Sequence, residues 1–379
     1  MHESLPKICD TPGATLDRAR TRTPGLTAVV AEDYQRLMPD TSDPRRIVVL
    51  SGGVGGARFL LGLQHHLAST GRGDDVEITV VSNTGDDIWL HGLKICPDLD
   101  TVMYTLGDGI DVDRGWGRRE ETWRVSEELA AYGVGPDWFG LGDRDLATHL
   151  VRTQMLDAGY PLSAVTEALC RRWEPGVRLL PMTDDRVETH IVVDDEAEPS
   201  GRRAVHLQEY WVRLRAEIPA RAVIPVGADK ASPGPGVLEA IEQADVVLLP
   251  PSNPVVSVGT ILAVPGLREA LHRTAAPIVG LSPLIAGQHV RGFAEQVLAA
   301  IGVECTAAAV AEHYGSRLRG GLLDGWLVDD ADAGLVQRLE AARIPTLARP
   351  LRMTDPAATA GMVADALLLA AKAVPRSAR

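Results

Sequence analysis

The sequence predicts an α/β protein built on a doubly wound, mostly parallel, Rossmann-like sheet. Apolar runs at residues 47–50, 76–82 and 244–250 are rich in Val, Ile and Leu, as strands buried on both faces are. Each run ends in a polar or glycine-rich segment, and apolar residues then recur at helical spacing from Phe59 to Leu67. Ligands of such sheets lie beyond the carboxyl ends of the strands, so we expect the functional residues there.

A glycine turn joins the first strand to the first helix and contains Gly52, Gly53, Gly55 and Gly56. Glycine permits positive φ and close approach of a ligand to the backbone, and a helix N-terminus presents free N–H groups to an anion. Arg58 replaces the third glycine of the dinucleotide fingerprint, and no Gly-Lys-Ser/Thr follows. The turn therefore predicts a phosphate site to which Arg58 adds charge. A tight connection without a ligand is the alternative.

Carboxylates follow the second strand, where Asn83-Thr-Gly-Asp-Asp ends in Asp86 and Asp87. Adjacent carboxylates near a phosphate favour Mg²⁺, which prefers oxygen ligands. Asp98 reads as the N-cap of the next helix, and Asp100, in its first turn, is within reach of the same pocket. The alternatives are a capped turn for Asp86 and Asp87, and a helix-dipole partner for Asp100.

A second ligand loop is predicted at residues 251–260, where Ser252, Asn253 and Ser257 offer neutral hydrogen bonds after a buried strand. A proline-stiffened connection is the alternative. Arg144 and His149 fall near the start of a helix expected at 145–156, with His149 ranked below the carboxylates. Six of the seven tryptophans precede residue 212, and one of them is placed to stack on a planar ligand unless all pack in the core.

We divide the chain into a tail at 1–45, a core at 46–132 and 214–379, and an insert at 133–213 that covers the substrate site. The insert should hold helices at 145–156 and 163–173 and a hairpin of strands 187–194 and 203–212. The formal net charge of −13 argues against nucleic-acid or anionic-membrane partners. No apolar window long enough for a membrane span occurs. Four scattered cysteines indicate reduced thiols in the cytoplasm.

Several segments, in this order, resemble the 2-phospho-L-lactate transferase family (CofD/FbiA) of coenzyme F-420 biosynthesis. They are Ser51-Gly-Gly-Val-Gly-Gly-Ala-Arg, Asn83-Thr-Gly-Asp-Asp, Pro97-Asp-Leu-Asp-Thr-Val-Met-Tyr-Thr-Leu, Gly142-Asp-Arg-Asp-Leu-Ala-Thr-His and Pro251-Ser-Asn-Pro-Val-Val-Ser. The glycine turn is weak alone, whereas the segments that begin at Pro97 and Gly142 are specific. The resemblance runs from about residue 46 to near the C-terminus and leaves out the first 45 residues.

The resemblance implies an Mg²⁺-dependent transferase that moves a phosphorylated three-carbon acid onto the terminal ribityl hydroxyl of the deazaflavin FO. The donor is enolpyruvyl-diphosphoguanosine in the actinobacterial branch, which this chain resembles most, or the lactyl ester in the archaeal branch. GMP leaves, and (dehydro) coenzyme F-420-0 forms. By this resemblance, Asp100 and Arg144 match FO-binding positions. Asp86 and Asp100 match an acidic, metal-associated cluster. The glycine turn and the Asn253 loop match the segments that bind the guanosine nucleotide. A homodimer is expected.

By this interpretation the hydroxyl of FO displaces GMP in line, and Asp86, Asp87 and Asp100 are the catalytic carboxylates. A carboxylate such as Asp87 accepts the hydroxyl proton, although the sequence does not select one acid. One alternative is a non-catalytic, nucleotide-sugar-binding regulator of the gluconeogenesis-factor type, against which the Asp100 and Arg144 segments weigh. The other is a nicotinamide-dependent oxidoreductase, against which the missing third glycine weighs.

Overall fold

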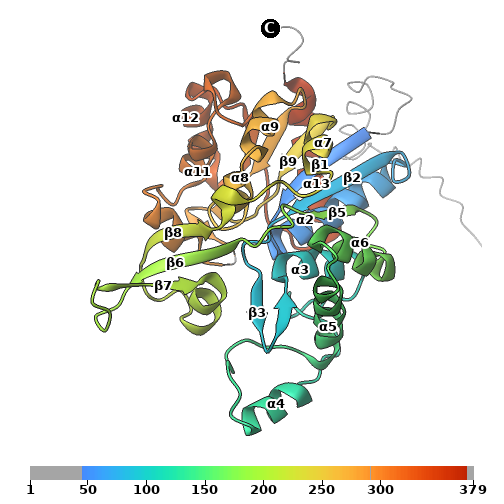
Figure 1. Ribbon diagram of the computed structural model, residues 1–379. Coiled ribbons are helices and arrows are strands. Elements are labelled where there is room, and N and C mark those ends of the chain that lie inside the picture. The colour runs from blue at the N-terminus through green and yellow to red at the C-terminus, as the bar shows by residue number, and fades with distance from the viewer. Residues whose placement is uncertain (1–44, 291, 374–379) are drawn as a thin grey trace, which may run out of the picture. The chain divides into compact units, whose positions relative to one another are not determined.

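The computed structural model describes residues 45–290 and 292–373. Its centre is a parallel sheet of seven strands in the order β14-β13-β10-β9-β1-β2-β5 (Figure 1). The strands are β1 (Arg45–Ser51), β2 (Val76–Ser82), β5 (Arg178–Pro181), β9 (Val246–Leu249), β10 (Ile278–Leu281), β13 (Gly325–Val328) and β14 (Thr346–Ala348). The predicted α/β fold is confirmed. The tail predicted at 1–45 lies outside the described residues, except for Arg45, which begins β1.

The winding of the sheet reverses between β1 and β9. The chain proceeds from β1 to β2 and β5 on one side, and later from β9 to β10, β13 and β14 on the other. Val49 of β1 is paired in register with Val80 of β2 and Leu248 of β9. The loops that leave β1 and β9 therefore emerge side by side at a topological switch point, where sheets of this kind bind ligands.

Helices cover both faces of the sheet because its strands are apolar on both faces. One face carries α2 (Val54–Ser69), α3 (Pro97–Leu106), α6 (Leu162–Trp173) and α13 (Pro356–Lys372). The other carries α7 (Val237–Glu242), α8 (Val258–Ala263), α9 (Leu267–Arg273), α11 (Ala307–Tyr314) and α12 (Val336–Ala341). Val48 and Leu50 of β1 point into this second layer and are buried. The two layers fix the strand ends, and with them the loops of the site.

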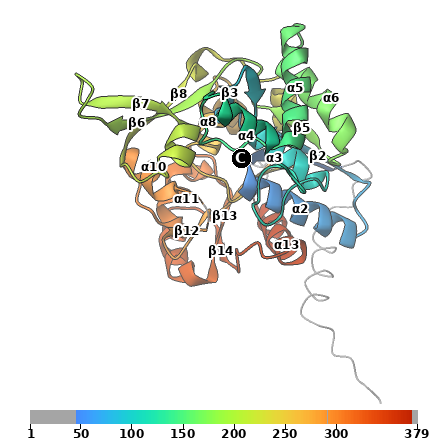
Figure 2. The same ribbon diagram turned by 90° about the horizontal axis from the view of Figure 1, so that it is seen from below.

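The segment between β2 and β9 adds a helical part and a small second sheet. Its helices are α4 (Arg124–Ala131), α5 (Asp143–Asp157) and α6, and the hairpin β3 (Ile88–Leu90) and β4 (Leu93–Ile95) precedes them. The second sheet, antiparallel and of order β7-β6-β8, consists of β6 (Glu188–Asp194), β7 (Arg202–His206) and β8 (Ala220–Val226). Figure 2 shows these strands beyond the central sheet, away from α2 and α13.

The elements predicted for the insert are confirmed in part. The helices predicted at 145–156 and 163–173 are α5 and α6, and the predicted hairpin consists of β6 and β7. Its second strand was predicted to reach Val212 but ends at His206, and Glu209–Arg213 forms a π-helix instead. Strand β8, from the part assigned to the core, pairs with β6.

Short elements complete the described chain. They are β11 (Leu284–Ile285), β12 (Gln288–His289), α10 (Ala294–Ala300) and the 3₁₀ turns Ala228–Lys230, Arg317–Arg319 and Asp330–Leu335. Within 45–290 and 292–373, no helix is both long and apolar enough to cross a bilayer.

Candidate active site

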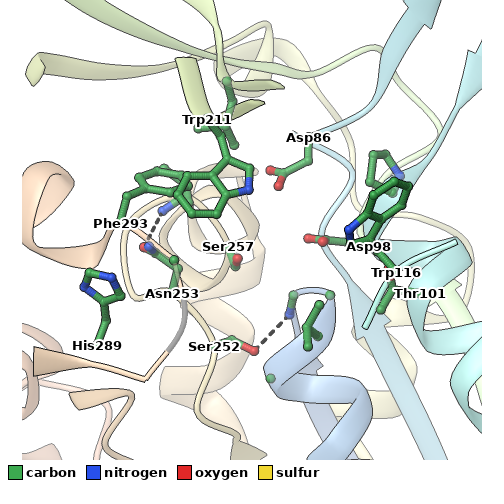
Figure 3. Close-up of a pocket in the computed structure, with 18 of the residues that line it drawn as sticks. Asp86, Asp98, Thr101, Trp116, Trp211, Ser252, Asn253, Ser257, His289 and Phe293 are labelled. Atoms are coloured by element: carbon green, nitrogen blue, oxygen red, sulfur yellow. Dashed lines mark hydrogen bonds between the residues drawn. The ribbon is translucent and has the colours of Figure 1, made fainter. Parts of the chain in front are cut away.

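A cavity of about 1160 Å³ opens at the carboxyl ends of the central strands. Its walls come from the glycine turn after β1, the Asp86 loop after β2, the loop after β9, and segments that follow β10 and β14. The first turns of α3 and α5, the 116–117 and 137–140 loops and the π-helix segment close the remaining sides. The structure thus brings the predicted glycine, acidic and Asn253 segments together in one cavity (Figure 3).

The glycine turn is shaped by close contact with neighbouring loops. None of its four glycines has a positive φ, so a need for left-handed backbone does not explain them. A Cβ on Gly55 would lie 2.2 Å from the carbonyl oxygen of Pro251, and one on Gly53 would lie 2.5 Å from Asp98 Oδ1. Gly52 and Gly56 are restricted in the same way by Ser257 and Ser51. Larger residues would therefore push apart the loops that form the site.

The N-terminus of α2 is open to an anion. Gly53 is the N-cap, no side chain caps the helix, and its first turn carries no acid. The backbone N–H groups there have no helical acceptor, and the helix dipole places partial positive charge at this end. Val54 and Gly55 line the cavity, and Arg58 lines it from the next turn. The predicted phosphate site thus has the required donors, although Gly56 is not among the lining residues.

The loop after β9 supplies polar groups beside this helix. Ser252 Oγ accepts a hydrogen bond of 3.1 Å from the Gly52 N–H and so joins the two loops of the switch point. Asn253 Oδ1 accepts from the N–H groups of Val255 and Val256 at 2.9 and 3.1 Å. The amide nitrogen of Asn253 thus remains as a donor for a ligand, and Ser257 lines the cavity beside it.

Two carboxylates converge on one amide at the cavity wall. Asn83 Nδ2 donates to Asp86 Oδ1 at 2.8 Å and to Asp98 Oδ2 at 2.9 Å. Burial raises the pKa of Asp98 to about 7, and burial together with the Asp98 charge raises the pKa of Asp86 well above 3.8. Two carboxylates that share one donor favour a bound cation or a retained proton. The sequence predicts that Asp86 and Asp100 form the metal-associated pair, whereas the carboxylate that lies beside Asp86 in the structure is that of Asp98.

Asp100 faces a different set of partners. It lies two residues after Asp98 on α3, about 200° around the helix axis. Its Oδ1 is bound by the buried guanidinium of Arg152, from α5. Its Oδ2 is buried and accepts no hydrogen bond from the described residues. This oxygen lies 3.7 Å from His149 Nδ1, and Asp100 also lines the cavity, so a ligand hydroxyl would supply the partner that the oxygen lacks.

A buried chain of polar groups extends from Asp100 along α5. His149 Nδ1 lies 3.0 Å from Arg152 Nη1 and must accept that hydrogen bond, because a guanidinium only donates. The imidazole proton is then on Nε2, which lies 3.3 Å from Asp145 Oδ2. Tyr104 donates to Asp145 Oδ1 at 2.6 Å. Sequence reasoning missed Arg152 and gave Asp145, near the start of the helix, no role in the site, although Asp145 and His149 have the i, i+4 spacing of one helix face.

Besides Gly56, two predicted site residues, Asp87 and Arg144, lie outside the cavity lining. The Asp87 carboxylate pairs with Lys94 Nζ at 3.1 Å and accepts from the Cys96 thiol, so it faces the interior. Burial raises the pKa of Asp87, and the lysine limits that rise. Arg144 pairs with the exposed Glu120 at 3.0 Å because it points about 100° away from its cavity-facing neighbour Asp145. Neither side chain is placed to touch a ligand in this conformation.

Aromatic side chains form two walls of the cavity. Trp211 packs on Phe293 with ring centroids 4.8 Å apart and planes 35° apart. Trp116 meets Trp123 edge to face at 6.3 Å. Trp116 and Trp211 remain 40% and 37% exposed, and both line the cavity, so each presents an open apolar face. Trp138 also lines the cavity and is half-buried, so the prediction that a tryptophan is available for a planar ligand has three candidates among the described residues.

Comparisons with known proteins identify relatives of this chain. Residues 47–352 match the model of a family described as 2-phospho-L-lactate transferase CofD. A protein of Streptomyces coelicolor named phosphoenolpyruvate transferase is 66% identical over 325 residues, 86% of this chain and 98% of that protein. Proteins of the same name from Thermobifida fusca and Mycolicibacterium smegmatis are 61% and 60% identical over 88% and 86% of this chain and 100% and 98% of theirs.

The fold also has a counterpart among solved structures. A protein of the UPF0052 family from Bacillus halodurans superposes with a TM-score of 0.57. The comparison covers 86% of this chain and 100% of that one at 17% identity. At this identity the likeness concerns the fold alone.

Proposed function

We propose that this chain, which belongs to the 2-phospho-L-lactate transferase (CofD) family, joins a phosphorylated three-carbon acid to the deazaflavin FO. The donor is a guanosine diphosphate ester, the acceptor is the terminal ribityl hydroxyl of FO, and the products are GMP and (dehydro) coenzyme F-420-0. The relatives named phosphoenolpyruvate transferase favour the enolpyruvyl donor over the lactyl donor.

The observation that carries the proposal is one cavity with two chemically different halves. Its volume of about 1160 Å³ exceeds the roughly 300–1,000 Å³ of most single-ligand pockets. One half offers anion donors at the α2 N-terminus, and the other offers Trp116, Asp100 and Asp145. The Asp86–Asp98 pair, which Asn83 bridges, lies where the two halves of the cavity meet. A nucleotide donor and a planar acceptor match this division.

The donor would bind where β1 and β9 end. The open N–H groups at Val54 and Gly55 would hold a phosphate of the diphosphate, and Arg58 would add a cation. The amide of Asn253 and the hydroxyl of Ser257 would bind the guanosine. The hydrogen bond between Gly52 and Ser252 keeps these two loops at a fixed separation. Much of the rate gain would come from positioning and charge neutralisation.

The Asp86–Asp98 pair fits an Mg²⁺ ion. Both carboxylates line the cavity, and burial raises the pKa of each although Asn83 donates to both, so a cation is the partner that would suit them. Mg²⁺ commonly takes one or two carboxylates together with substrate phosphates and water. Asp86 and Asp98 would hold the ion, which would neutralise charge on the diphosphate. This proposal differs from the Asp86 and Asp100 pair predicted from the sequence.

Asp100 would orient the attacking hydroxyl of FO. Its unpartnered Oδ2 would accept the hydroxyl proton, while Arg152 holds Oδ1 and keeps the carboxylate in one orientation. The bond from the hydroxyl oxygen to the distal phosphorus forms as that phosphorus loses the bridging oxygen to GMP. Trp116 would stack on the deazaflavin ring. Because Asp100 lines the cavity and Asp87 does not, we assign the role of proton acceptor to Asp100 in this proposal.

Product analysis by mass spectrometry tests the proposal. The protein is incubated with FO, Mg²⁺ and each guanosine donor, and the deazaflavin product is weighed. We expect the phosphoenolpyruvyl adduct with GMP released, and a loss of turnover of about 10²–10⁴-fold in Asp100→Asn. Asp137→Asn, at another lining carboxylate, is the matched control and should retain turnover.

The other outcomes discriminate among the alternatives. A phospholactyl product would keep the family reaction and change the donor. Unmodified FO, with a folded and metal-loaded protein, would contradict the proposal. Binding of a uridine diphosphate sugar would then favour the nucleotide-sugar-binding regulator, and binding of NAD(P) the oxidoreductase.

A further inference from the structure

Two consecutive residues at the end of the π-helix segment have left-handed backbone. Arg215 and Ala216 both have a φ of +52°. Non-glycine residues adopt this conformation at a cost in stability, and such strain is concentrated at functional sites. Among the described residues, Arg215 is the single non-glycine residue with positive φ that lines the cavity. The strain therefore coincides with the site.

The surrounding core imposes this conformation. The Ala216 N–H donates to the Tyr210 carbonyl at 2.9 Å, and Ala216 is 3% exposed. The buried Tyr210 side chain in turn donates to the carbonyl of Ile218 at 2.8 Å. The turn is thus anchored on both sides of Arg215, whose own side chain is left at the cavity surface.

The guanidinium of Arg215 has no partner among the described residues, either in a hydrogen bond or in an ion pair. This is notable because five carboxylates line the same cavity: Asp86, Asp98, Asp100, Asp137 and Asp145. A neighbouring arginine, Arg213, pairs with Glu209 at 3.0 Å and does not line the cavity. Arginine presents a planar fork of donors that suits a carboxylate or a phosphate. Arg215 is exposed, as a ligand-binding arginine at a cavity mouth must be, and it shares with Arg58 and Arg352 the property of lining the cavity without a side-chain partner among the described residues. An anionic ligand group would fit its guanidinium.

The position of this segment indicates which anion it meets. Gln208 Nε2 donates to the Asp86 carbonyl at 3.4 Å, so the segment begins beside the acidic pair. In Figure 3, Trp211 lies across the cavity from Ser252, and thus from the glycine turn that Ser252 contacts. A donor with its nucleotide at that turn and its distal phosphorus at Asp86 and Asp98 would extend its remaining substituent toward this wall.

We propose that Arg215 binds the carboxylate of the three-carbon acid carried by the donor. This assignment rests on the proposed function, since it takes the ligand to be a carboxylated ester of a guanosine diphosphate. The strained turn leaves the guanidinium at the cavity surface, and Arg58, on α2 beside the glycine turn, would serve the phosphates. Arg215 is thereby a specificity-determining residue that distinguishes the donor from plain GDP.

Calorimetric binding to the full chain with Mg²⁺ tests the assignment, with lactyl-diphosphoguanosine and GDP as probes. Arg215→Gln should weaken binding of the ester by about 10- to 100-fold, the range for hydrogen bonds to charged groups, and leave GDP binding within twofold. The methyl ester of the same probe should bind wild type and variant alike. Arg213→Gln is the matched control and should bind both probes as wild type does.

A second variant separates this role from a structural one. Glycine accepts a φ of +52° without strain, so Arg215→Gly should melt at the same or a higher temperature while losing ester affinity as Arg215→Gln does. If both variants bind the ester as wild type does, or lose affinity for the ester and for GDP equally, the assignment of Arg215 is overturned while the proposed function stands. Failure of the wild-type protein to bind either probe would overturn the proposed function and this assignment with it.

Discussion

Replacing Asp98 with Asn should stabilise the metal-free protein at neutral and alkaline pH. Asp98 is 8% exposed, and its carboxylate shares the amide of Asn83 with Asp86. The Gly53 N–H also donates to it. Burial nevertheless raises the pKa of Asp98 from 3.8 to about 7, which means that the fold disfavours the charged form. An asparagine keeps the shape and removes the charge, at the cost of one of the two oxygens that accept from Asn83 and Gly53.

The size and sign of the effect follow from that rise in pKa. The folded state holds the Asp98 proton up to about pH 7, whereas the unfolded chain releases it near 3.8. Stability therefore falls as pH rises through this window, and the loss is complete above it. At about 1.36 kcal/mol per pH unit, the penalty reaches ~4 kcal/mol as an upper bound. The variant escapes this penalty, so its advantage should appear at pH 8 and vanish near pH 4.

Thermal unfolding with EDTA at pH 4.5, 6 and 8 measures the difference. We expect Asp98→Asn to melt up to roughly 5–10 °C above wild type at pH 8, with the gap closing as pH falls. Asp74→Asn, at an exposed turn position, should show no such pH-dependent gap. A gap that is constant across pH, or a variant that melts below wild type at pH 8, would refute the reasoning. The variant should also lose transferase activity, since it removes a proposed Mg²⁺ ligand.

Two further substitutions test other parts of the site. Gly55→Ala should lower the free energy of unfolding by ~1–3 kcal/mol and weaken GDP binding, because its Cβ would meet the Pro251 carbonyl oxygen at 2.2 Å. Gly361 is exposed in α13, and a Cβ there would have no atom within 4 Å, so Gly361→Ala should raise the free energy of unfolding by up to about 1 kcal/mol. Urea unfolding measures both changes. Equal effects of the two would contradict the packing explanation. Arg152→Met should cost about 3–5 kcal/mol by leaving the Asp100 charge buried and unpaired, and Asp100→Asn in the same chain should restore part of that loss. Additive losses in the double variant would show that the pair is not coupled.

The central strands could be predicted because each is buried on both faces. The runs in β1, β2 and β9 are continuous and apolar, so the signal is strong without an alignment. The outer strands β5 and β14 were missed because they are short, and β5 ends in a proline. Residues Glu209–Arg213 carry strand-like Tyr, Trp and Val but form a π-helix, which is set by the burial of Tyr210 against Phe293 rather than by local preference.

The loops of the site could be predicted from the strand ends, but the pairing of their side chains could not. Asp98 was read as a cap, yet the N-cap of α3 is Cys96, and the Asp98 carboxylate instead meets Asn83 from another loop. Arg152 is on α5, and only the packing of α5 brings its guanidinium to Asp100. Such contacts join segments far apart in sequence, so no local pattern specifies them.

The most direct test of the central claim is a crystal structure with GDP, FO and Mn²⁺ in place of Mg²⁺, with the anomalous signal used to locate the metal. We predict one peak within bonding distance of Asp86 and Asp98 and of the diphosphate, with the guanosine along the β1 and β9 loops. The ribityl hydroxyl should lie within hydrogen-bonding distance of Asp100. A metal bound elsewhere, or FO and GDP competing for one half of the cavity, would contradict the account.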